Sequence, residues 1–140
     1  MRVAALDIGK VRVGLAVSDE LGALAHPRAP LDGRNRKQLL QQIREFAEEE
    51  EITRFLVGLP LDASGQEGPA ARKALDFAEQ VAEATGLPVV MWDERFTTVE
   101  ATRRLQEGGH RGKKSRQKVD GAAACVMLQA WLDRPRRRST

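Results

Sequence analysis

Two short apolar runs at the start of the chain constrain its fold most. Residues 1–7 form the first run, which ends at the carboxylate of Asp7, and residues 11–17 form the second, with the partial alternation of a strand. The link between them is only a few residues long and contains Gly9. A link this short favours a hairpin, so the chain is predicted to begin with two antiparallel buried strands.

The rest of the chain alternates between helical and strand patterns. Residues 21–31 contain Gly22, Pro27 and Pro30, so a third strand there is expected to be irregular or at a sheet edge. The pattern then predicts a helix over 36–51, a strand over 54–58, a loop over 59–68, a helix over 69–86, a strand over 88–92, a helix over 97–108 and a last helix over 119–128. This order predicts an α/β fold with a mixed five-stranded sheet, antiparallel in its first three strands and parallel in the last two, flanked by helices on both faces.

Each predicted helix carries an apolar stripe for the core. The stripes comprise Leu39, Leu40, Ile43, Phe46 and Ala47 in the first helix, Ala71, Ala74, Leu75, Ala78, Val81 and Ala82 in the second, and Val119, Ala122, Ala123, Val126 and Met127 in the last. The acidic run over 48–51 is interpreted as a solvated helix end.

The chain of 140 residues suits one domain, predicted over 1–133, with a basic tail over 134–140. The single cysteine, Cys125, excludes an intramolecular disulfide and a cysteine-cluster zinc site, and its apolar neighbours favour a small core residue. No stretch approaches the roughly 20 apolar residues of a membrane span, and no signal-peptide pattern is present. A cytoplasmic protein that does not enter a membrane is expected, as a monomer or a homodimer.

Three acidic residues fall where such a fold would bring them together. Asp7 ends the first strand, Glu94 closely follows the last strand, and Asp120 begins the last helix. Ligands of such sheets bind beyond the carboxyl ends of the strands, which is where Asp7 and Glu94 are expected. Buried carboxylates are costly unless they are paired or bind a metal, and converging carboxylates repel each other unless cations neutralise them. The cluster therefore predicts a hard divalent cation, Mg²⁺ or Mn²⁺, and with it phosphate chemistry.

Each acid also has a structural alternative. Asp7 could cap a turn, Glu94 could form an ion pair with Arg95 or Arg12, and Asp120 could complement the helix dipole. These roles would leave the acids without a metal.

Several neighbours of Glu94 are candidates for supporting roles. Asp93 points to the opposite face of a regular strand, and a bulge there would let it replace Glu94. Thr97 and Thr98 start the next helix, whose N-terminus could offer N–H groups to a phosphate. Gly9 suits a tight backbone turn near a phosphate.

Basic residues are clustered although the net charge is only +3. One cluster lies over 109–118 and the other over 134–138. In the first, Lys113, Lys114, Arg116 and Lys118 are predicted to clamp a nucleic-acid backbone, the alternative being a solvated loop. Arg12 is predicted either to hold a phosphate or to pair with Asp19. His110 is expected to be a loop residue.

Four ordered motifs carry a family resemblance. They are DIGKVRVGLAVSD at 7–19, VGLPL at 57–61 followed by Gly65 and Gly68, WDERFTT at 92–98, and KVDGAAA at 118–124. With the predicted element order, they resemble the ribonuclease H-like nucleases and, more closely, the YqgF (RuvX) family.

This resemblance implies a nuclease that hydrolyses phosphodiester bonds with two metal ions. By it, Asp7, Glu94 and Asp120 are the metal-binding catalytic acids. The family is described both as a nuclease that matures the 5′ end of precursor 16S rRNA in ribosome biogenesis and as a Holliday junction resolvase. Some relatives of the fold carry a fourth acid on the last helix, where this chain has Ala123 and Ala124.

The expected partner is nucleic acid, either structured or single-stranded RNA or branched DNA. The first strand offers no aromatic residue for base stacking, which favours backbone or shape recognition. Two other classes of protein share parts of this pattern. An actin-like ATPase would need two such domains, for which the chain is too short. A catalytically silent nucleic-acid-binding module would not need all three acids.

Overall fold

The computed structural model describes residues 1–62, 64–96 and 121–135. The elements in chain order are β1 (Arg2–Ile8), β2 (Arg12–Ser18), β3 (Ala25–Asp32), α1 (Arg36–Glu49), β4 (Ile52–Leu59), α2 (Pro69–Thr85), β5 (Val89–Asp93), the 3-10 turn η1 (Glu94–Phe96) and α5 (Ala122–Asp133). The five strands form one sheet in the order β3-β2-β1-β4-β5. The first three are antiparallel, whereas β4 is parallel to both β1 and β5, which confirms the predicted fold class.

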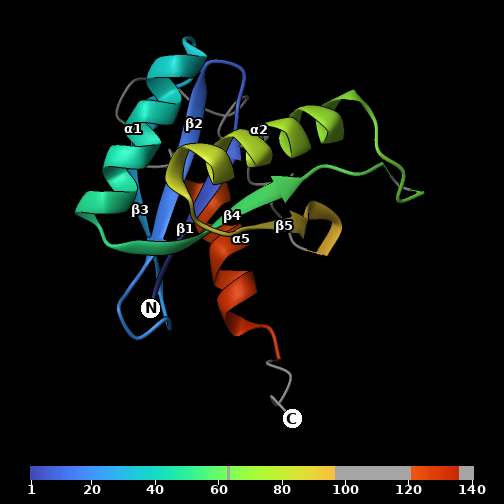
Figure 1. Cartoon of the computed structure of the whole chain (residues 1–140). Helices are drawn as coiled ribbons and strands as arrows, with labels where there is room; N and C mark the ends of the chain where they lie inside the picture. The colour runs from blue at the N-terminus through green and yellow to red at the C-terminus, as the bar shows by residue number, and fades with distance from the viewer. Residues whose placement is uncertain (63, 97–120, 136–140) are drawn as a thin grey trace, which may run out of the picture.

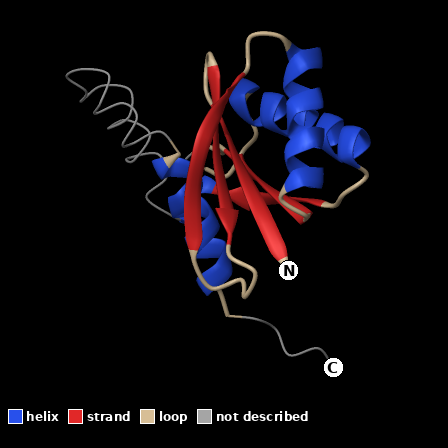
Figure 2. Cartoon of the chain, turned by 90° about the vertical axis from the view of Figure 1, so that its left-hand side faces the viewer, coloured by secondary structure: helices blue, strands red, loops and turns tan. Residues whose placement is uncertain are grey.

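The sheet lies between two helical layers. Helices α1 and α2 cover one face and α5 covers the other, as the nearly edge-on view of the sheet shows (Figures 1 and 2). Alternation along the strands supplies both interfaces: Ala4 and Leu6 of β1 face α1 and α2, while Val3 and Ala5 face α5. The chain therefore buries both faces of its central strand.

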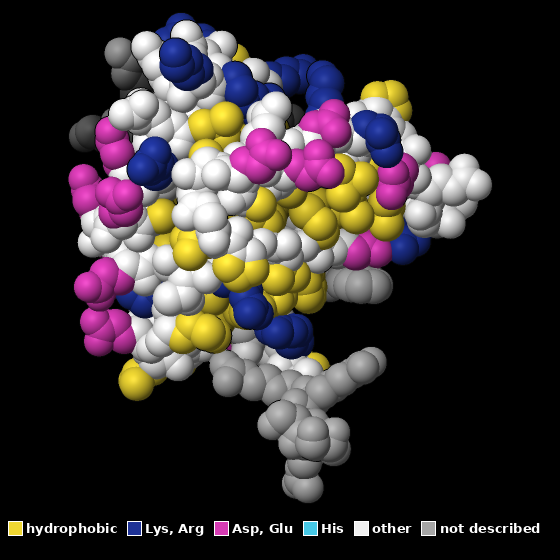
Figure 3. Space-filling model, viewed as in Figure 1, with side chains coloured by type: hydrophobic (Ala, Val, Ile, Leu, Met, Phe, Trp, Pro, Cys, Tyr) yellow, Lys and Arg dark blue, Asp and Glu magenta, His cyan; other side chains and the backbone are white. Residues whose placement is uncertain are grey.

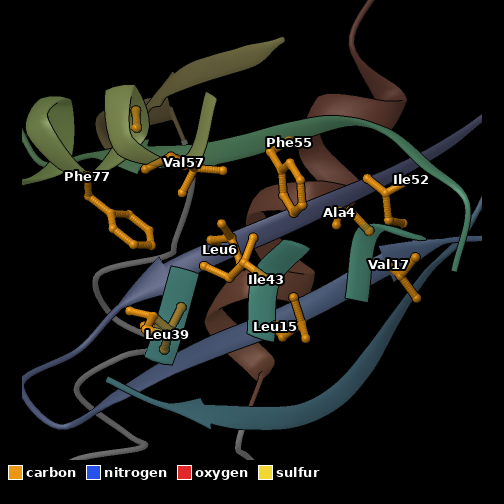
Figure 4. Close-up of a cluster of buried hydrophobic side chains, with 14 of the residues drawn as sticks. Ala4, Leu6, Leu15, Val17, Leu39, Ile43, Ile52, Phe55, Val57 and Phe77 are labelled. Atoms are coloured by element: carbon orange, nitrogen blue, oxygen red, sulfur yellow. The ribbon is translucent and has the colours of Figure 1, made fainter. Parts of the chain in front are cut away.

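The core beneath α1 and α2 combines strand residues with one stripe from each helix (Figure 4). Leu39, Ile43 and Ala47 are its fully buried α1 residues, in agreement with the predicted stripe. In α2 the predicted stripe missed Phe77, which is only 1% exposed, whereas Leu75 is half-buried. The stripe of α2 is rotated toward Phe77 because a large aromatic ring buries more apolar area than a leucine at the flank.

The second core lies between the sheet and α5, which differs from the predicted last helix at both ends. The helix begins at Ala122, after Gly121 in the left-handed conformation (φ 84°), and continues to Asp133 rather than ending at 128. It ends before Pro135 because the preceding residue, Arg134, takes the extended conformation that a following proline favours. The extension buries Trp131, which the predicted stripe did not include.

Local signals in the sequence agree with several turns and edges. Gly9 closes the β1–β2 hairpin, where its N–H donates to the Arg12 carbonyl at 2.9 Å. A β-carbon at Gly9 would stand 2.7 Å from that oxygen, so the close approach requires glycine. Strand β3 lies at the sheet edge with an irregular register against β2, and Gly86 ends α2 at φ 72°, both as expected.

The interpretation of 48–51 as a wholly solvated helix end was wrong for Glu50. Its Oε1 lies 3.0 Å from Arg28 Nη2, and its carbonyl accepts a hydrogen bond of 2.9 Å from Arg2. The end of α1 is thereby tied to both β3 and β1. In the described part of the chain, no helix is long and apolar enough to cross a membrane.

Replacing the aromatic ring at the centre of this core should destabilise the fold. We expect Phe77→Ala to lower the free energy of unfolding by about 3–5 kcal/mol, through lost burial and the cavity left behind. Urea denaturation measures the change, with Lys37→Ala on the exposed face of α1 as a control within about 0.5 kcal/mol of wild type. A loss as small as that of the control would show that Phe77 does not anchor α2.

Candidate active site

Asp7 lies in the central strand on the face that α5 covers. It is only 6% exposed, and it shares its face with Val3 and Ala5 by strand alternation. Its antiparallel partner in β2 is Gly14, where a β-carbon would lie 3.5 Å from the Asp7 β-carbon. The missing side chain at Gly14 leaves room beside the Asp7 carboxylate.

Glu94 reaches the same face from β5. It is the first residue of η1, directly after β5, and is 7% exposed. Its carboxylate oxygen Oε2 occupies the space that a side chain at Gly58 would take, and a β-carbon there would lie 3.2 Å from both Glu94 Cδ and Met127 Sδ. Since Met127 belongs to α5, the Glu94 carboxylate lies between the end of β4 and this helix.

The register of the sheet brings the two carboxylates together. Leu6 of β1 is paired with Val57 of β4, so the next residues, Asp7 and Gly58, lie side by side on neighbouring strands about 4.8 Å apart. The carboxylate of Glu94 stands over Gly58, and Gly14 flanks Asp7 on its other side. The two buried acids therefore lie over the same end of the sheet, where the residues beside Asp7 on both neighbouring strands are glycines.

Asp120, the third predicted acid, lies outside the described residues. Gly121, which follows it in the chain, packs against the strand beside the acids: a β-carbon there would lie 3.1 Å from the Leu15 carbonyl oxygen, one residue from Gly14. The predicted residues Thr97, Thr98, Lys113, Lys114, Arg116 and Lys118, together with the rest of the basic run, also lie outside the described residues. Within residues 1–62, 64–96 and 121–135, no group of three or more potential metal-ligating side chains occurs.

Asp93 and Glu94 are adjacent in the chain but make different contacts. Arg95 donates to both carboxylate oxygens of Asp93, with Nη2 2.7 Å from Oδ2. The hydrogen bond from the Arg95 side chain holds the pKa of Asp93 below its ordinary value. Asp93 and Arg95 are therefore engaged with each other, whereas the Glu94 carboxylate lies at Gly58.

The loop between β4 and α2 is tightly hydrogen-bonded beside this pair. Asp62 Oδ1 accepts from the Ser64 hydroxyl and, at 2.9 Å each, from the backbone N–H groups of Ser64 and Gln66. These bonds, the Ser64 side chain first, lower the pKa of Asp62. Gly65 follows at φ 87°, where a β-carbon would lie 3.1 Å from Arg95 Nη1. The glycine of this motif thus lets the loop pack closely against Arg95.

Arg12 starts β2 at the end of the sheet that carries the two acids. Ile8 is paired with Val13, which places Arg12 just beyond the carboxyl end of β1. The predicted alternative, a pair with Asp19, is wrong because these residues flank opposite ends of a seven-residue strand, roughly 20 Å apart. Asp19 instead accepts a 2.8 Å hydrogen bond from the Ala23 N–H in its own turn.

Other sequence predictions concern the helix above the acids. Ala123 and Ala124, where relatives of the fold carry a fourth acid, are fully buried against the sheet. Cys125 is half-buried among apolar side chains, as expected, and burial raises the pKa of its thiol. Small residues here let α5 lie close to β1.

A pocket of about 290 Å³ adjoins the acids at the same end of the sheet and extends toward α2. Its walls include the ends of β1 and β4, the first turns of α2 and Glu94. Sequence reasoning missed two residues that line it, Lys10 and Lys73. The position of Lys10 directly after Gly9, in the hairpin beside Asp7, could have indicated that it lies near the site. Nothing in the local sequence distinguishes Lys73 from any other exposed lysine on a helix.

The five-stranded mixed sheet between two helical layers has the RNase H-like fold. The structure resembles that of Thermus thermophilus RuvC, with a TM-score of 0.53, 18% sequence identity and 94% of each chain covered. It also resembles the fowlpox virus resolvase in a complex with Holliday junction DNA, with a TM-score of 0.55, 10% identity, and 95% of this chain and 97% of that chain covered. At such low identities these likenesses bear on the fold alone.

Sequence similarity identifies the family. Residues 1–134 match the RuvX family, described as Holliday junction resolvase. A protein from Anaeromyxobacter sp. (strain Fw109-5) is 44% identical over 133 residues, covering 95% of this chain and 97% of the relative. One from Myxococcus xanthus (strain DK1622) is 40% identical over 133 residues, covering 95% and 88%. Both relatives bear the name "Putative pre-16S rRNA nuclease". The chain belongs to the RuvX family of nucleases.

A side chain at Gly58 should displace Glu94. We expect Gly58→Ala to weaken binding of Mg²⁺ by about 10-fold or more, because its β-carbon overlaps Glu94 Oε2 and moves the carboxylate away from Asp7. The rise in melting temperature with added Mg²⁺ measures this affinity.

The matched control is Gly68→Ser, at a glycine where a β-carbon would meet no atom within 4 Å. Serine is also favoured at this helix N-cap position. The control should keep the wild-type Mg²⁺ response. A wild-type response in Gly58→Ala would contradict the prediction that Glu94 helps to bind the ion.

Proposed function

We propose that this chain is a divalent-metal-dependent nuclease that cleaves phosphodiester bonds in RNA and matures the 5′ end of precursor 16S rRNA. The observation that carries the proposal is the pair of buried carboxylates, Asp7 and Glu94, over neighbouring strands with glycine beside them. Relatives up to 44% identical over nearly the whole chain, named for pre-16S rRNA, favour this substrate.

The residues present fit a hard divalent cation. Asp7 and Glu94 offer only carboxylate oxygens, the donors that Mg²⁺ and Mn²⁺ prefer. Gly14 and Gly58 keep side chains out of the space beside them. We propose that Asp120 joins them as the third acid that would hold the two ions. When bound, the ions would neutralise the acids and stabilise the charge on the phosphodiester oxygens.

The remaining residues of the site position and bind. We propose that the ion pair of Asp93 with Arg95 helps to hold the turn that carries Glu94. Arg12, at the same end of the sheet, is proposed to hold a phosphate of the substrate. Lys113, Lys114, Arg116 and Lys118 are proposed to bind the nucleic-acid backbone, and Thr97 and Thr98 a phosphate at their helix start.

The proposed division of the chain is a nuclease domain over 1–133 and a basic tail after it. At the junction the Arg134 guanidinium stacks on the Trp131 ring, 3.8 Å from its centroid, and Nη1 donates to the Trp131 carbonyl. The tail would therefore start from a fixed point on α5. Its arginines add positive charge, which favours a polyanionic partner.

A DNA substrate is the second candidate. The family is described as a Holliday junction resolvase, and the fowlpox virus protein of the same fold is seen with junction DNA. The same acids would cleave either substrate. The surface around them would determine whether RNA or branched DNA binds.

Cleavage assays with Asp7→Asn test the proposal. Wild type, Asp7→Asn and the exposed control Asp76→Asn are compared on labelled precursor 16S rRNA and on a four-way DNA junction, with Mg²⁺, Mn²⁺ or EDTA. We expect RNA cleavage that needs metal and falls about 100-fold or more in Asp7→Asn alone, since ion-held charge stabilisation contributes several kcal/mol.

The other outcomes separate the alternatives. Metal-dependent cutting of the junction alone would replace the RNA substrate by branched DNA. Binding of either nucleic acid without Asp7-dependent cleavage would contradict the nuclease proposal and favour a catalytically silent binding module.

A further inference from the structure

We propose that the pocket between the β1–β2 hairpin and α2 binds a backbone phosphate of the substrate strand next to the bond that is cut, held by Lys10 and Lys73. The inference rests on the proposed nuclease function and adds a binding subsite to it. The reasons are the position of the pocket, its charge and the chemistry of its walls.

The pocket lies where ligands of such sheets bind. Its floor is formed by the carboxyl ends of the parallel strands β1 and β4, through Ile8, Gly58 and Pro60. Glu94 belongs both to the wall of the pocket and to the acidic pair. A nucleic-acid strand bound at the acids would therefore extend directly into the pocket. Asp7 faces α5 and Ile8 faces α2, because neighbouring residues of β1 point to opposite faces. The pocket therefore extends from the acid site toward α2 and shares Gly58 and Glu94 with it.

The charge of the pocket favours an anion. Lys10 comes from the hairpin and Lys73 from the second turn of α2, and both are exposed. Among the described residues, neither lysine takes part in an ion pair or a side-chain hydrogen bond. Glu94 is the only carboxylate that the described residues contribute to the walls, and an ion at the acids would neutralise it. In Figure 3, Lys and Arg side chains are frequent along the upper edge of the molecule.

The start of α2 adds to the same field. Pro69 is the first residue of the helix, its first turn carries no acidic residue, and Ala70 lines the pocket. The first N–H groups of a helix carry a partial positive charge that stabilises nearby anions. The helix end alone would not define a site, but here it reinforces two lysines around one pocket.

The shape and the walls select a phosphate rather than a base. A volume of about 290 Å³ is at the small end of ligand pockets, so it suits about one nucleotide unit. The described walls offer only glycine and aliphatic surface beside the charges, through Ile8, Pro60 and Ala74, and therefore no aromatic platform for base stacking. Lysines bind phosphate as point charges, so the contact would not depend on sequence.

Charge removal at the two lysines tests the subsite. We compare Lys10→Gln/Lys73→Gln with wild type and with the matched control Lys37→Gln, an exposed lysine on α1 outside this pocket. RNA binding is titrated over a salt series in EDTA, and cleavage kinetics are measured with Mg²⁺. We expect the double variant to lower the magnitude of the slope of log K against log salt by about 0.7, which corresponds to the loss of one phosphate contact on a single strand. Its KM should rise about 10-fold while kcat changes less than about 2-fold, because the contact is made equally in the ground and transition states.

The charge-conserving pair Lys10→Arg/Lys73→Arg should restore the slope and KM. Wild-type slope and KM in the glutamine variant would overturn the subsite, as would a fall in kcat with both unchanged. The binding slopes in EDTA do not depend on cleavage. If wild type cut neither RNA nor DNA, the nuclease proposal would fail, whereas the slopes would still decide whether the lysines contact phosphate.

Discussion

The structure depends on placing two carboxylates, Asp7 and Glu94, side by side at the end of a buried sheet. Like charges in a poorly hydrated site repel each other and lose solvation, so this arrangement is costly without a cation. The surrounding sequence accommodates the two acids: Gly14 leaves room beside Asp7, and the Glu94 carboxylate occupies the space that a side chain at Gly58 would take. Glycine at these two positions removes side-chain packing from the inner strands of the sheet, which stability alone does not explain.

The scaffold holds the two acids from different parts of the chain. Asp7 lies in the central strand, with neighbouring strands on both sides, whereas Glu94 follows β5 beside the ion pair of Asp93 with Arg95. Helix α5 closes the site from above, and its buried alanines, Ala123 and Ala124, allow a close approach to the sheet. A fourth acid at either alanine position would have to enter this packed interface.

Local sequence patterns predicted the order of helices and strands well because they reflect the backbone preferences of the residues at turns, sheet edges and helix ends. The hairpin at Gly9, the edge strand containing Pro27, and the helix bounded by Pro69 and Gly86 all follow from backbone preferences. The same reasoning placed Asp7 and Glu94 at the carboxyl ends of strands, where the structure has them.

Long-range contacts were beyond such reasoning. The overlap of Glu94 with the space of Gly58 brings the turn after β5 against β4. Lys10 and Lys73 line the same pocket only because the hairpin and α2 both border it. Phe77 was missed because several registers of the α2 stripe satisfy the same helical period, and only packing selects between them. The tie between Glu50 and both Arg2 and Arg28 likewise needs the folded sheet.

The most direct measurement is a crystal structure grown with Mn²⁺, with the metal located by anomalous scattering. We expect an anomalous peak between the carboxylates of Asp7 and Glu94, at about 2.0–2.3 Å from an oxygen of each, as hard-cation coordination requires. In Glu94→Gln crystals grown in the same way, this peak should be lost or greatly reduced. A peak elsewhere, or none at the acids at millimolar Mn²⁺, would contradict the metal-dependent site on which the proposed nuclease rests.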